Sequence, residues 1–314
     1  MCIRDRWDVA AGKQIRAGVL KHPEWVTDIV VSDDGRTALT SCDDGKLRLW
    51  SLADAKLLQT MESPPAASPK TDSDSAEAPK TQTAFTSIDM SSDGQLALTA
   101  CAADGTVRLW NLADGEELAA SDDGAWLNVG DRGGLVWAAR FTPDDRGVLV
   151  IGGNDARIFN LDSRQLEVRF SPHGVVASAD LSPDGKHVAT GSWDRSAKIW
   201  DRGAGKVLVK LDAIHNGFIN SVRYSPDGVK LLTASDDGTA RLWNAADGAI
   251  LEPVSGDGKS RIRQATFSPD GKRVLAASND KTAKVYDVAT GELLLALAGH
   301  EWAVRSADFS ADGK

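Results

Sequence analysis

One phrase recurs along this chain at a nearly fixed spacing, and no other feature constrains the fold as strongly. A short apolar, β-prone segment ends in an aromatic residue six times, and the intervals from Trp200 to Trp243 and from Trp243 to Tyr286 are both 43 residues. Copies of a turn that resembles Ser-Pro-Asp-Gly lie between these segments, and they begin at Ser32, Ser91, Thr142, Ser182, Ser225, Ser268 and Ser310. Such a period is typical of stacked supersecondary units that are not stable singly.

Each period divides into four short strands. In the copy over residues 218–251, β-prone stretches are separated by turns at 225–228, 236–238 and 246–248, where Pro and Gly stand at positions that turns favour. Four antiparallel strands per period predict an all-β protein, a β-propeller of four-stranded blades. We count six complete blades and two partial ones, which predict a seven-bladed ring or a fragment of one.

Several repeated phrases resemble those of the WD-repeat family. They are Gly299-His300, the Ser-Pro-Asp-Gly turns, the phrase SDDGTARLW at 235–243 and the pair Trp7-Asp8. The fourth-strand phrase at 289–294 is especially similar to bacterial members. The resemblance covers the chain except residues 1–6 and an insert near 61–84, and six copies in register make it specific.

The resemblance implies a hydrogen-bonded tetrad inside the blades that keep the pattern. In the family it joins a His before the first strand, an Asp in the second turn, a Ser or Thr on the third strand and the terminal Trp. The pattern is complete in two copies, at His215, Asp237, Thr239 and Trp243 and at His173, Asp194, Ser196 and Trp200. We interpret these residues as structural rather than as a catalytic triad, because they recur whereas a nucleophile is needed once.

The ends and the spacing predict the domain organisation. Residues 1–6 break the third-strand pattern, so we expect a non-native leader there and a propeller fragment over 7–314. The insert over 61–84 is rich in Pro, Ala, Ser and Asp, so we expect it to be disordered, and an extension at 121–134 is expected to be a loop. The partial blades over 7–20 and 301–309 either close one ring without a second strand or belong to different rings.

Bulk properties exclude several classes of function. The net charge is −9 and no basic block occurs, so we expect no nucleic-acid partner. No apolar run reaches about eighteen residues, so no membrane insertion is predicted. Walker, Rossmann, zinc and EF-hand signatures are absent from the sequence, so no cofactor, metal or small-molecule substrate is predicted. No secretory signal is visible, and we expect a cytoplasmic protein.

Two other residue classes have structural interpretations. Of three cysteines, Cys42 and Cys101 stand where other copies carry Ser or Ala, and we expect small buried residues there; Cys2 is the third. A basic residue stands two positions before each terminal aromatic residue: Arg48, Arg108, Arg157, Lys198, Arg241 and Lys284. We expect their stems to pack between blades and their charged heads to be paired or to reach solvent, rather than to form a phosphate site.

Function must be argued from a site, because propellers serve many functions. In the family, partners gather on the face where the first strands begin and the second turns lie, here called the top face. The resemblance places these residues there: Trp25, Trp137, Trp193, Phe218, Asp236, Arg261, Arg263, Trp302 and Arg305. Aromatic residues and Arg dominate binding hot spots, and Trp193 is the strongest candidate because it stands in a turn.

These features predict a non-catalytic scaffold that binds proteins or peptides. The alternative is a regulatory or targeting propeller of a larger enzyme, such as a bacterial Ser/Thr kinase or protease, whose catalytic domain lies outside this sequence. An enzyme within the propeller needs converging His, Glu and Asp groups. Four of the five histidines occupy the structural position of the repeat and only His187 is left over, so this third class is disfavoured.

Overall fold

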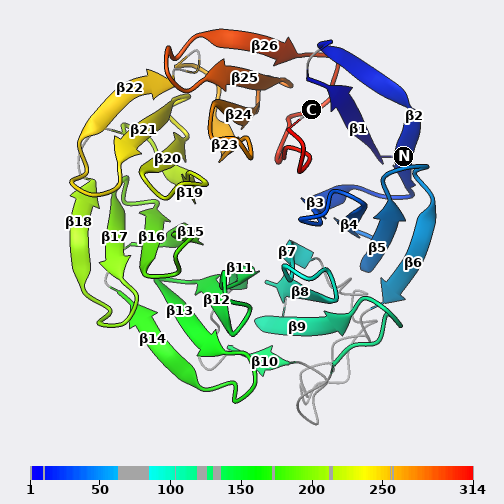
Figure 1. The fold of residues 1–314 in the computed structure, drawn as a ribbon, viewed down its shortest axis with the longest axis horizontal. Coiled ribbons are helices and arrows are strands. Elements are labelled where there is room, and N and C mark those ends of the chain that lie inside the picture. The colour runs from blue at the N-terminus through cyan, green and yellow to red at the C-terminus, as the bar shows by residue number, and fades with distance from the viewer. Residues whose placement is uncertain are drawn as a thin grey trace, which may run out of the picture.

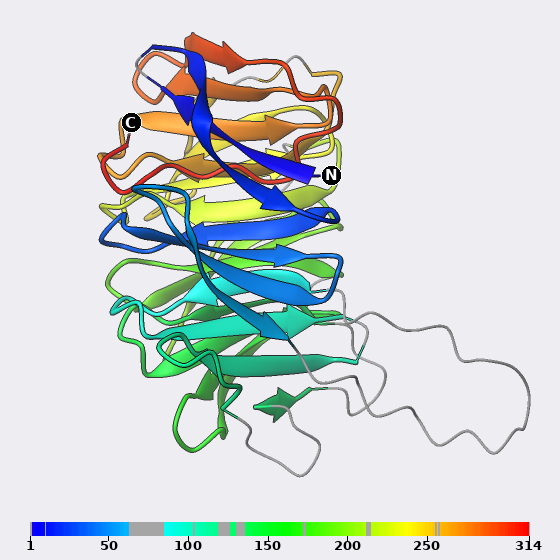
Figure 2. The ribbon, with the colours of Figure 1, turned by 90° about the vertical axis from the view of Figure 1, so that its right-hand side faces the viewer.

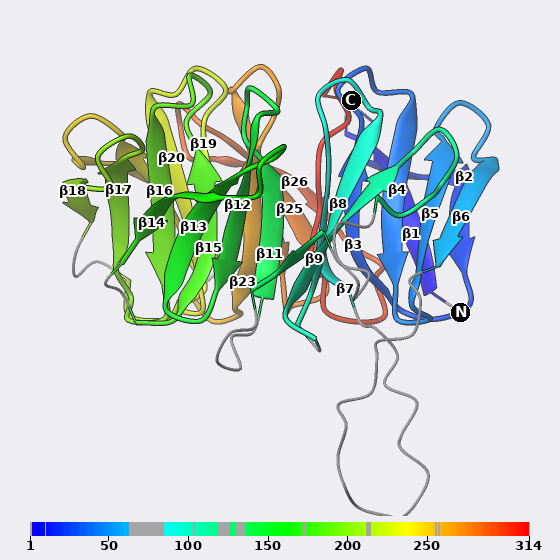
Figure 3. The same cartoon turned by 90° about the horizontal axis from the view of Figure 1, so that it is seen from below.

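The chain forms a ring of antiparallel β-sheets (Figure 1). The computed structural model describes residues 2–9, 11–62, 85–102, 104–118, 126–129, 136–171, 174–211, 215–254, 256 and 258–313. Within these residues every regular element is a strand, and the strands run across the thickness of the disc (Figures 2 and 3). The predicted all-β propeller is confirmed.

Six sheets have four strands each, numbered here as blades in chain order and ordered from the centre of the ring outward. Blade 1 contains β3 (Val26–Val31), β4 (Thr37–Cys42), β5 (Lys46–Ser51) and β6 (Leu57–Glu62); blade 2 contains β7 (Phe85–Met90), β8 (Leu96–Cys101), β9 (Thr106–Asn111) and β10 (Leu127–Asn128); blade 3 contains β11 (Val136–Phe141), β12 (Gly147–Gly152), β13 (Asp155–Asn160) and β14 (Leu166–Phe170).

The second half of the ring repeats this order. Blade 4 contains β15 (Val176–Leu181), β16 (His187–Ser192), β17 (Ala197–Asp201) and β18 (Val207–Leu211); blade 5 contains β19 (Ile219–Tyr224), β20 (Lys230–Ser235), β21 (Ala240–Asn244) and β22 (Ile250–Val254); blade 6 contains β23 (Ile262–Phe267), β24 (Arg273–Ser278), β25 (Ala283–Asp287) and β26 (Leu293–Leu297). The equal strand order reflects the period of the sequence.

Second strands are apolar or small at successive positions, because neighbouring blades cover both faces of each sheet. In β8, residues 97–101 are all buried. Gly191 of β16 has no room for a side chain, since an added Cβ would lie 2.7 Å from atoms of both Ile219 and Val222 in blade 5. Cys42 and Cys101 are buried and neither is in a disulfide, which confirms that they fill small core positions.

The Ser-x-Asp-Gly turn joins the first and second strands through a fixed set of hydrogen bonds. In blade 5 the Ser225 hydroxyl donates to Asp227 Oδ1 at 2.5 Å and accepts from the Lys230 amide at 2.9 Å. Gly228 has a φ of 71°, a left-handed conformation that favours glycine. The hydroxyl–carboxylate bond recurs in the other blades. It fixes these loops on the face opposite the top face.

Segments from both ends of the chain share the seventh position of the ring. β1 (Cys2–Asp8) pairs antiparallel with β2 (Lys13–His22), between β26 and blade 1 (Figure 1). Residues 303–310 lie on the inner side, where Val304 and Phe309 pack in one cluster with Trp7 and Leu297. This is the first of the two predicted closures, in which both partial blades belong to one ring. Residues 2–6, expected as a leader, lie in β1 at the position of a third strand.

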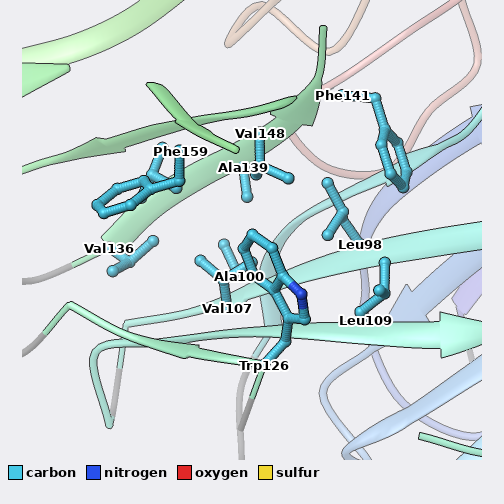
Figure 4. Close-up of a cluster of buried hydrophobic side chains, with 11 residues drawn as sticks. Leu98, Ala100, Val107, Leu109, Trp126, Val136, Ala139, Phe141, Val148 and Phe159 are labelled. Carbon is cyan, nitrogen blue, oxygen red and sulfur yellow. The ribbon is translucent and has the colours of Figure 1, made fainter. Parts of the chain in front are cut away.

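One predicted loop contributes to the core. Within the extension at 121–134 the described residues are 126–129, and Trp126 is only 4% exposed. Its ring lies with Val107 and Val136 between blades 2 and 3 (Figure 4), and the next two residues form β10. The expectation of a loop was wrong here, because burying a large indole outweighs the Gly- and Asp-rich flanks.

The predicted insert lies almost entirely outside the described residues. Met61 and Glu62 end β6, whereas 63–84 are not among the described residues, so disorder of this segment stays a prediction. Within the part of the chain that the structure describes, no helix has the length and apolar character needed to cross a membrane.

Candidate partner-binding face

Hydrogen bonds inside a blade fix where its top-face turn lies. In blade 5, His215 Nδ1 is 2.9 Å from Asp237 Oδ2, and the Thr239 hydroxyl donates to Asp237 Oδ1 at 2.6 Å. His215 Nε2 is 2.8 Å from Thr233 Oγ1, which also accepts from Trp243 Nε1 at 2.9 Å. The rings of His215 and Trp243 are both buried, and an unpaired polar atom there would destabilise the fold. The network therefore ties the second turn to the core of the sheet.

The hydroxyl that links His to Trp belongs to the second strand, and sequence reasoning missed it. Indole Nε1 atoms donate to such hydroxyls at 2.9–3.1 Å in four blades: Trp50 to Thr40, Trp110 to Thr99, Trp200 to Thr190 and Trp243 to Thr233. Each Thr precedes its Trp by ten or eleven residues, a recurrent spacing that could have been found. Thr239, the hydroxyl that the resemblance pointed to, lies 3.3 Å from His215 Nδ1 and bonds to Asp237.

Blade 4 repeats part of this geometry. The Ser196 hydroxyl donates to Asp194 Oδ1 at 2.7 Å, and Asp194 Oδ2 accepts from the Gly174 amide at 3.1 Å. His173 lies outside the described residues, so its place in a tetrad stays a prediction. In blade 5, burial opposes ionisation of Asp237, but hydrogen bonds from His215 and Thr239 outweigh it and hold the pKa of this carboxyl below its ordinary value.

Backbone bonds join the second turn to the start of the first strand in blades 1, 4, 5 and 6 and so assemble the top face. The Trp193 amide donates to the Val175 carbonyl at 3.0 Å, and the Asp236 amide donates to the Phe218 carbonyl at 2.9 Å. Both turns are thereby held beside the innermost strands. The geometry brings candidate residues of blades 4 and 5 to one surface.

Three aromatic side chains from successive blades form a continuous row on this face. Trp193 stacks on Phe218 with ring centroids 5.7 Å apart and an interplanar angle of 19°, and Trp137 lies 6.0 Å from Trp193 on the other side. Trp193 is 39% exposed and Phe218 44%. We call Trp137, Trp193 and Phe218 the aromatic row. Large apolar rings at this exposure, held rigid by one another, suit a partner's apolar side chain.

Charged and amide groups continue the row into blade 6. Asp236 accepts from Asn220 Nδ2 at 2.7 Å and lies 3.6 Å from Arg261 Nε and 3.8 Å from Arg263 Nη1. Arg263 Nε also donates to Asn279 Oδ1 at 3.1 Å. The Arg261 side chain is 56% exposed, so its guanidinium keeps donors available to solvent or to a ligand.

The remaining predicted residues form a second group, at blade 1 and the seventh position. Trp25 and Trp302 meet edge to face with centroids 5.8 Å apart, and they are 48% and 64% exposed. Arg305 is exposed in the same C-terminal segment. The predicted site residues thus fall into two aromatic groups rather than one patch.

Four of the six basic residues that precede the terminal aromatic residues are paired with carboxylates. Their carboxylate partners are Asp44 for Arg48, Asp104 and Glu117 for Arg108, Asp155 for Arg157 and Asp280 for Lys284, at 2.5–3.1 Å. Arg241 Nε donates to Thr239 Oγ1 at 3.4 Å, and Lys198 Nζ lies 6.0 Å from the centre of the Trp200 ring. The charged groups of these six side chains are distributed around the ring, one in each blade.

Sequence reasoning also did not single out charged groups on the innermost strands. Burial raises the pKa of Asp89 to about 6, against the opposing charge of Arg140 in blade 3. Its carboxylate accepts from the Phe141 amide at 2.8 Å and so joins blades 2 and 3. Among the described residues, no group of three or more His, Cys, Asp or Glu side chains is arranged to hold a metal ion.

Comparison with known protein families finds the repeat that forms the blades. The family model described as WD domain, G-beta repeat, matches residues 14–51, 79–111, 164–201, 206–244 and 252–287, more than half of the chain. The chain belongs to this family. Four of the five matched WD repeats run from the outer strand of one blade to the third strand of the next, and the match over 79–111 ends at the third strand of blade 2.

Two individual relatives match parts of this WD-repeat protein. The small ribosomal subunit protein RACK1y of Oryza sativa subsp. japonica is 28% identical over 168 residues, which cover 40% of this chain and 50% of that protein. The U3 small nucleolar RNA-associated protein 12 of Saccharomyces cerevisiae is 31% identical over 120 residues, which cover 37% of this chain and 11% of that protein. The chain thus spans at most half of the length of these relatives.

Proposed function

We propose that this WD-repeat protein is a non-catalytic scaffold that binds a protein or peptide segment through the aromatic row of its top face. The stacked and exposed pair of Trp193 and Phe218 carries the proposal, because aromatic rings held in place by their neighbours lose little freedom on binding. The two relatives support the general role of a scaffold but not the binding surface. One is named as a ribosomal subunit protein and the other as an RNA-associated protein.

The neighbouring charges suggest the chemistry of the partner segment. Arg261 is mostly exposed and lies 3.6 Å from Asp236, a loose pairing that leaves guanidinium N–H groups for another acceptor. A ligand with an apolar side chain on the aromatic row and a carboxylate over Arg261 matches this surface. Charge-assisted bonds from Arg to carboxylates are among the stronger polar contacts at interfaces.

Two expectations from the sequence stay predictions. The net charge of −9 disfavours binding to nucleic acid, and retention of a labelled single-stranded RNA by the purified chain would contradict that expectation. No observation on the described residues favours the alternative in which the propeller serves a kinase or protease domain. Sequencing the gene on both sides of this region tests that alternative directly.

Selection of peptides from a random displayed library tests the scaffold proposal even while the natural partner is unidentified. We expect the selected peptides to carry an apolar or aromatic residue near acidic ones. Trp193→Ala removes the central ring of the aromatic row and should weaken their binding about tenfold or more, in the range of hot-spot residues. Affinity is measured by calorimetry on the full chain.

Leu208→Ala is the matched control. Leu208 lies on β18, the outer strand of blade 4, and is 53% exposed, so the substitution removes exposed apolar surface away from the top face. We expect it to leave the affinity unchanged, and circular dichroism should report the same fold for both variants. Peptides that bind Trp193→Ala as tightly as the parent protein would rule out the aromatic row as the binding surface.

A further inference from the structure

Positive charge gathers on the top face at blade 6, in a protein whose net charge is −9. Arg261 precedes β23, and Arg263 is the second residue of that strand. Their guanidinium groups lie 3.6 Å and 3.8 Å from the carboxylate of Asp236, so the two cations share one counter-ion. Lys281 lies in the second turn of the same blade and is exposed.

Backbone hydrogen bonds bring Arg305 to the same part of the top face. The Asn279 amide donates to the Arg261 carbonyl at 3.0 Å, and the Val304 amide donates to the Ser278 carbonyl at 3.0 Å. The second turn of blade 6 is thus bonded both to the start of β23 and to the segment that carries the exposed Arg305. We call this group of four side chains the basic cluster: Arg261, Arg263, Lys281 and Arg305.

The basic cluster has more positive charge than its nearest carboxylate balances. Asp236 is shared by the two arginines of blade 6, and within the described residues no ion pair involves Lys281 or Arg305. The side chains of Arg261 and Arg263 are both partly exposed, so their guanidinium groups keep N–H donors for a ligand. A ligand group with two negative charges balances such a cluster better than a single carboxylate does.

The conformation of Lys281 points to a use for its charge. Lys281 has a φ of 71°, a left-handed conformation that glycine adopts more readily than a residue with a side chain. Glycine takes this place in the second turns of blades 1, 2 and 5, at Gly45, Gly105 and Gly238, whereas blade 4 has Arg195 there with a φ of 74°. Both exceptions are basic residues on the top face, which favours a role for positive charge at this surface.

We propose that the basic cluster binds a phosphorylated Ser or Thr side chain in the partner segment whose apolar residue binds the aromatic row. This inference rests on the proposed function and names the anionic group of the same partner. A phosphate monoester carries roughly two negative charges near neutral pH and several strong acceptor oxygens. Guanidinium groups bind such oxygens through paired N–H···O bonds, and Asp236 holds two guanidinium groups beside one point.

The extent of the basic cluster favours a single phosphate over a nucleic-acid backbone. Binding to nucleic acid depends on basic groups that follow the phosphates of a strand. Here the basic groups gather around one turn, and the neighbouring surface consists of Asp236 and the aromatic row. A phosphorylated side chain close to an apolar residue matches this arrangement.

Three peptide libraries test the proposal on the full chain. Each library has one fixed central residue, which is phosphoserine, Ser or Glu, and random residues on both sides. The sequence most enriched on the immobilised protein is then made with each of the three central residues and titrated by fluorescence anisotropy. We expect the phosphoserine peptide to bind about tenfold more tightly than the Ser peptide, and more tightly than the Glu peptide.

The pH dependence distinguishes a doubly charged phosphate from a single carboxylate. The second pKa of phosphoserine is about 6, so a change from about pH 7.5 to about pH 5.5 should weaken binding of the phosphoserine peptide several-fold. The Glu peptide keeps its charge over this range and should bind with nearly constant affinity. An equal pH response of the two peptides would contradict the proposal.

Protein variants assign the phosphate to the basic cluster. Arg261→Ala/Arg263→Ala should abolish the preference for phosphoserine over Ser. The matched control is Arg36→Ala/Lys186→Ala, which removes two exposed basic side chains from Ser-x-Asp-Gly turns on the opposite face and should keep the preference. Trp193→Ala should weaken the phosphoserine and Ser peptides by the same factor.

The possible outcomes separate this inference from the proposed function. Peptides that need Trp193 but bind equally well with Ser and with phosphoserine would overturn the inference and leave the proposed function intact. A preference for phosphoserine that survives Arg261→Ala/Arg263→Ala would also overturn it. Displacement of the phosphoserine peptide by single-stranded RNA at equal phosphate concentration would assign the basic cluster to nucleic acid instead. If the protein retained none of the libraries, both proposals would fail.

Discussion

Blades 5 and 3 have the same strand order and equivalent pairing, yet different chemistry holds their third strands. In blade 5, Trp243 donates to Thr233 on the neighbouring strand. In blade 3, Phe159 takes the place of the Trp and Val150 takes the place of the Thr. In both blades the second-strand residue stands two positions after the residue that pairs with the aromatic one, which is Leu231 in blade 5 and Val148 in blade 3. Blade 3 thus replaces a buried polar pair with an apolar pair.

In blade 3 an ion pair, rather than an indole–hydroxyl bond, supplies the polar contact of the third strand. Asp155, the first residue of β13, lies 2.8 Å from Arg157 Nε and 2.6 Å from Arg169 Nε. The two blades show that the aromatic residue and its second-strand neighbour vary together. Blade 6 follows the same rule, because Tyr286 has Ala276 at the corresponding place. In the six complete blades, a Thr stands at this position only where an indole N–H can use it.

Removing the shared hydroxyl of blade 5 should have the largest effect. Thr233→Val leaves both Trp243 Nε1 and His215 Nε2 buried without their present partner, and each unsatisfied group costs about 1–3 kcal/mol. We expect the free energy of unfolding to fall by about 2–4 kcal/mol, measured by urea titration followed by circular dichroism. Val150→Ala in blade 3 removes apolar contacts without orphaning a polar group, which makes it a useful reference.

The double variant Thr233→Val/Trp243→Phe gives blade 5 the pair that blade 3 has. Because the indole donor is removed together with its acceptor, the loss in the double variant should be smaller than the sum of the two single losses by about 1 kcal/mol or more. Additive losses would contradict the view that the two residues act as one unit.

Much of the architecture of the blades could be anticipated from the sequence, but the contacts between side chains of different strands and blades could not. The period of 43 residues and the Ser-x-Asp-Gly turns predicted the blades, because turn chemistry is local. The recurrent spacing between Thr and Trp could have pointed to Thr233, but its bond to the Trp243 indole depends on the register of the two strands. The aromatic row depends on ring closure, which brings Trp137, Trp193 and Phe218 of three blades together. Local composition also suggested a loop where Trp126 is buried.

Removing the charge of Asp237 should have an intermediate effect that depends on pH. Hydrogen bonds hold the pKa of this carboxyl below its ordinary value of 3.8, so its contribution is complete well above that pH and is lost as the pH falls towards the folded-state pKa. Asp237→Asn should lower the free energy of unfolding by about 1–2 kcal/mol at about pH 6. The difference from the parent protein should shrink at about pH 3. A difference that is equal at both values would exclude the charge as its source.

The smallest effect is expected at the ion pair of blade 3. The Arg169 side chain is 53% exposed and that of Arg157 25%, so solvent screens their attraction to Asp155. Asp155→Asn should therefore cost about 1 kcal/mol or less. Raising the salt concentration from about 0.1 M to about 1 M shortens the screening length from roughly 10 Å to 3 Å and should reduce that loss further. The loss in Thr233→Val involves hydrogen bonds between buried groups and should be the same at both concentrations. If salt changed the two losses alike, the contrast between the ion pair of blade 3 and the shared hydroxyl of blade 5 would not hold.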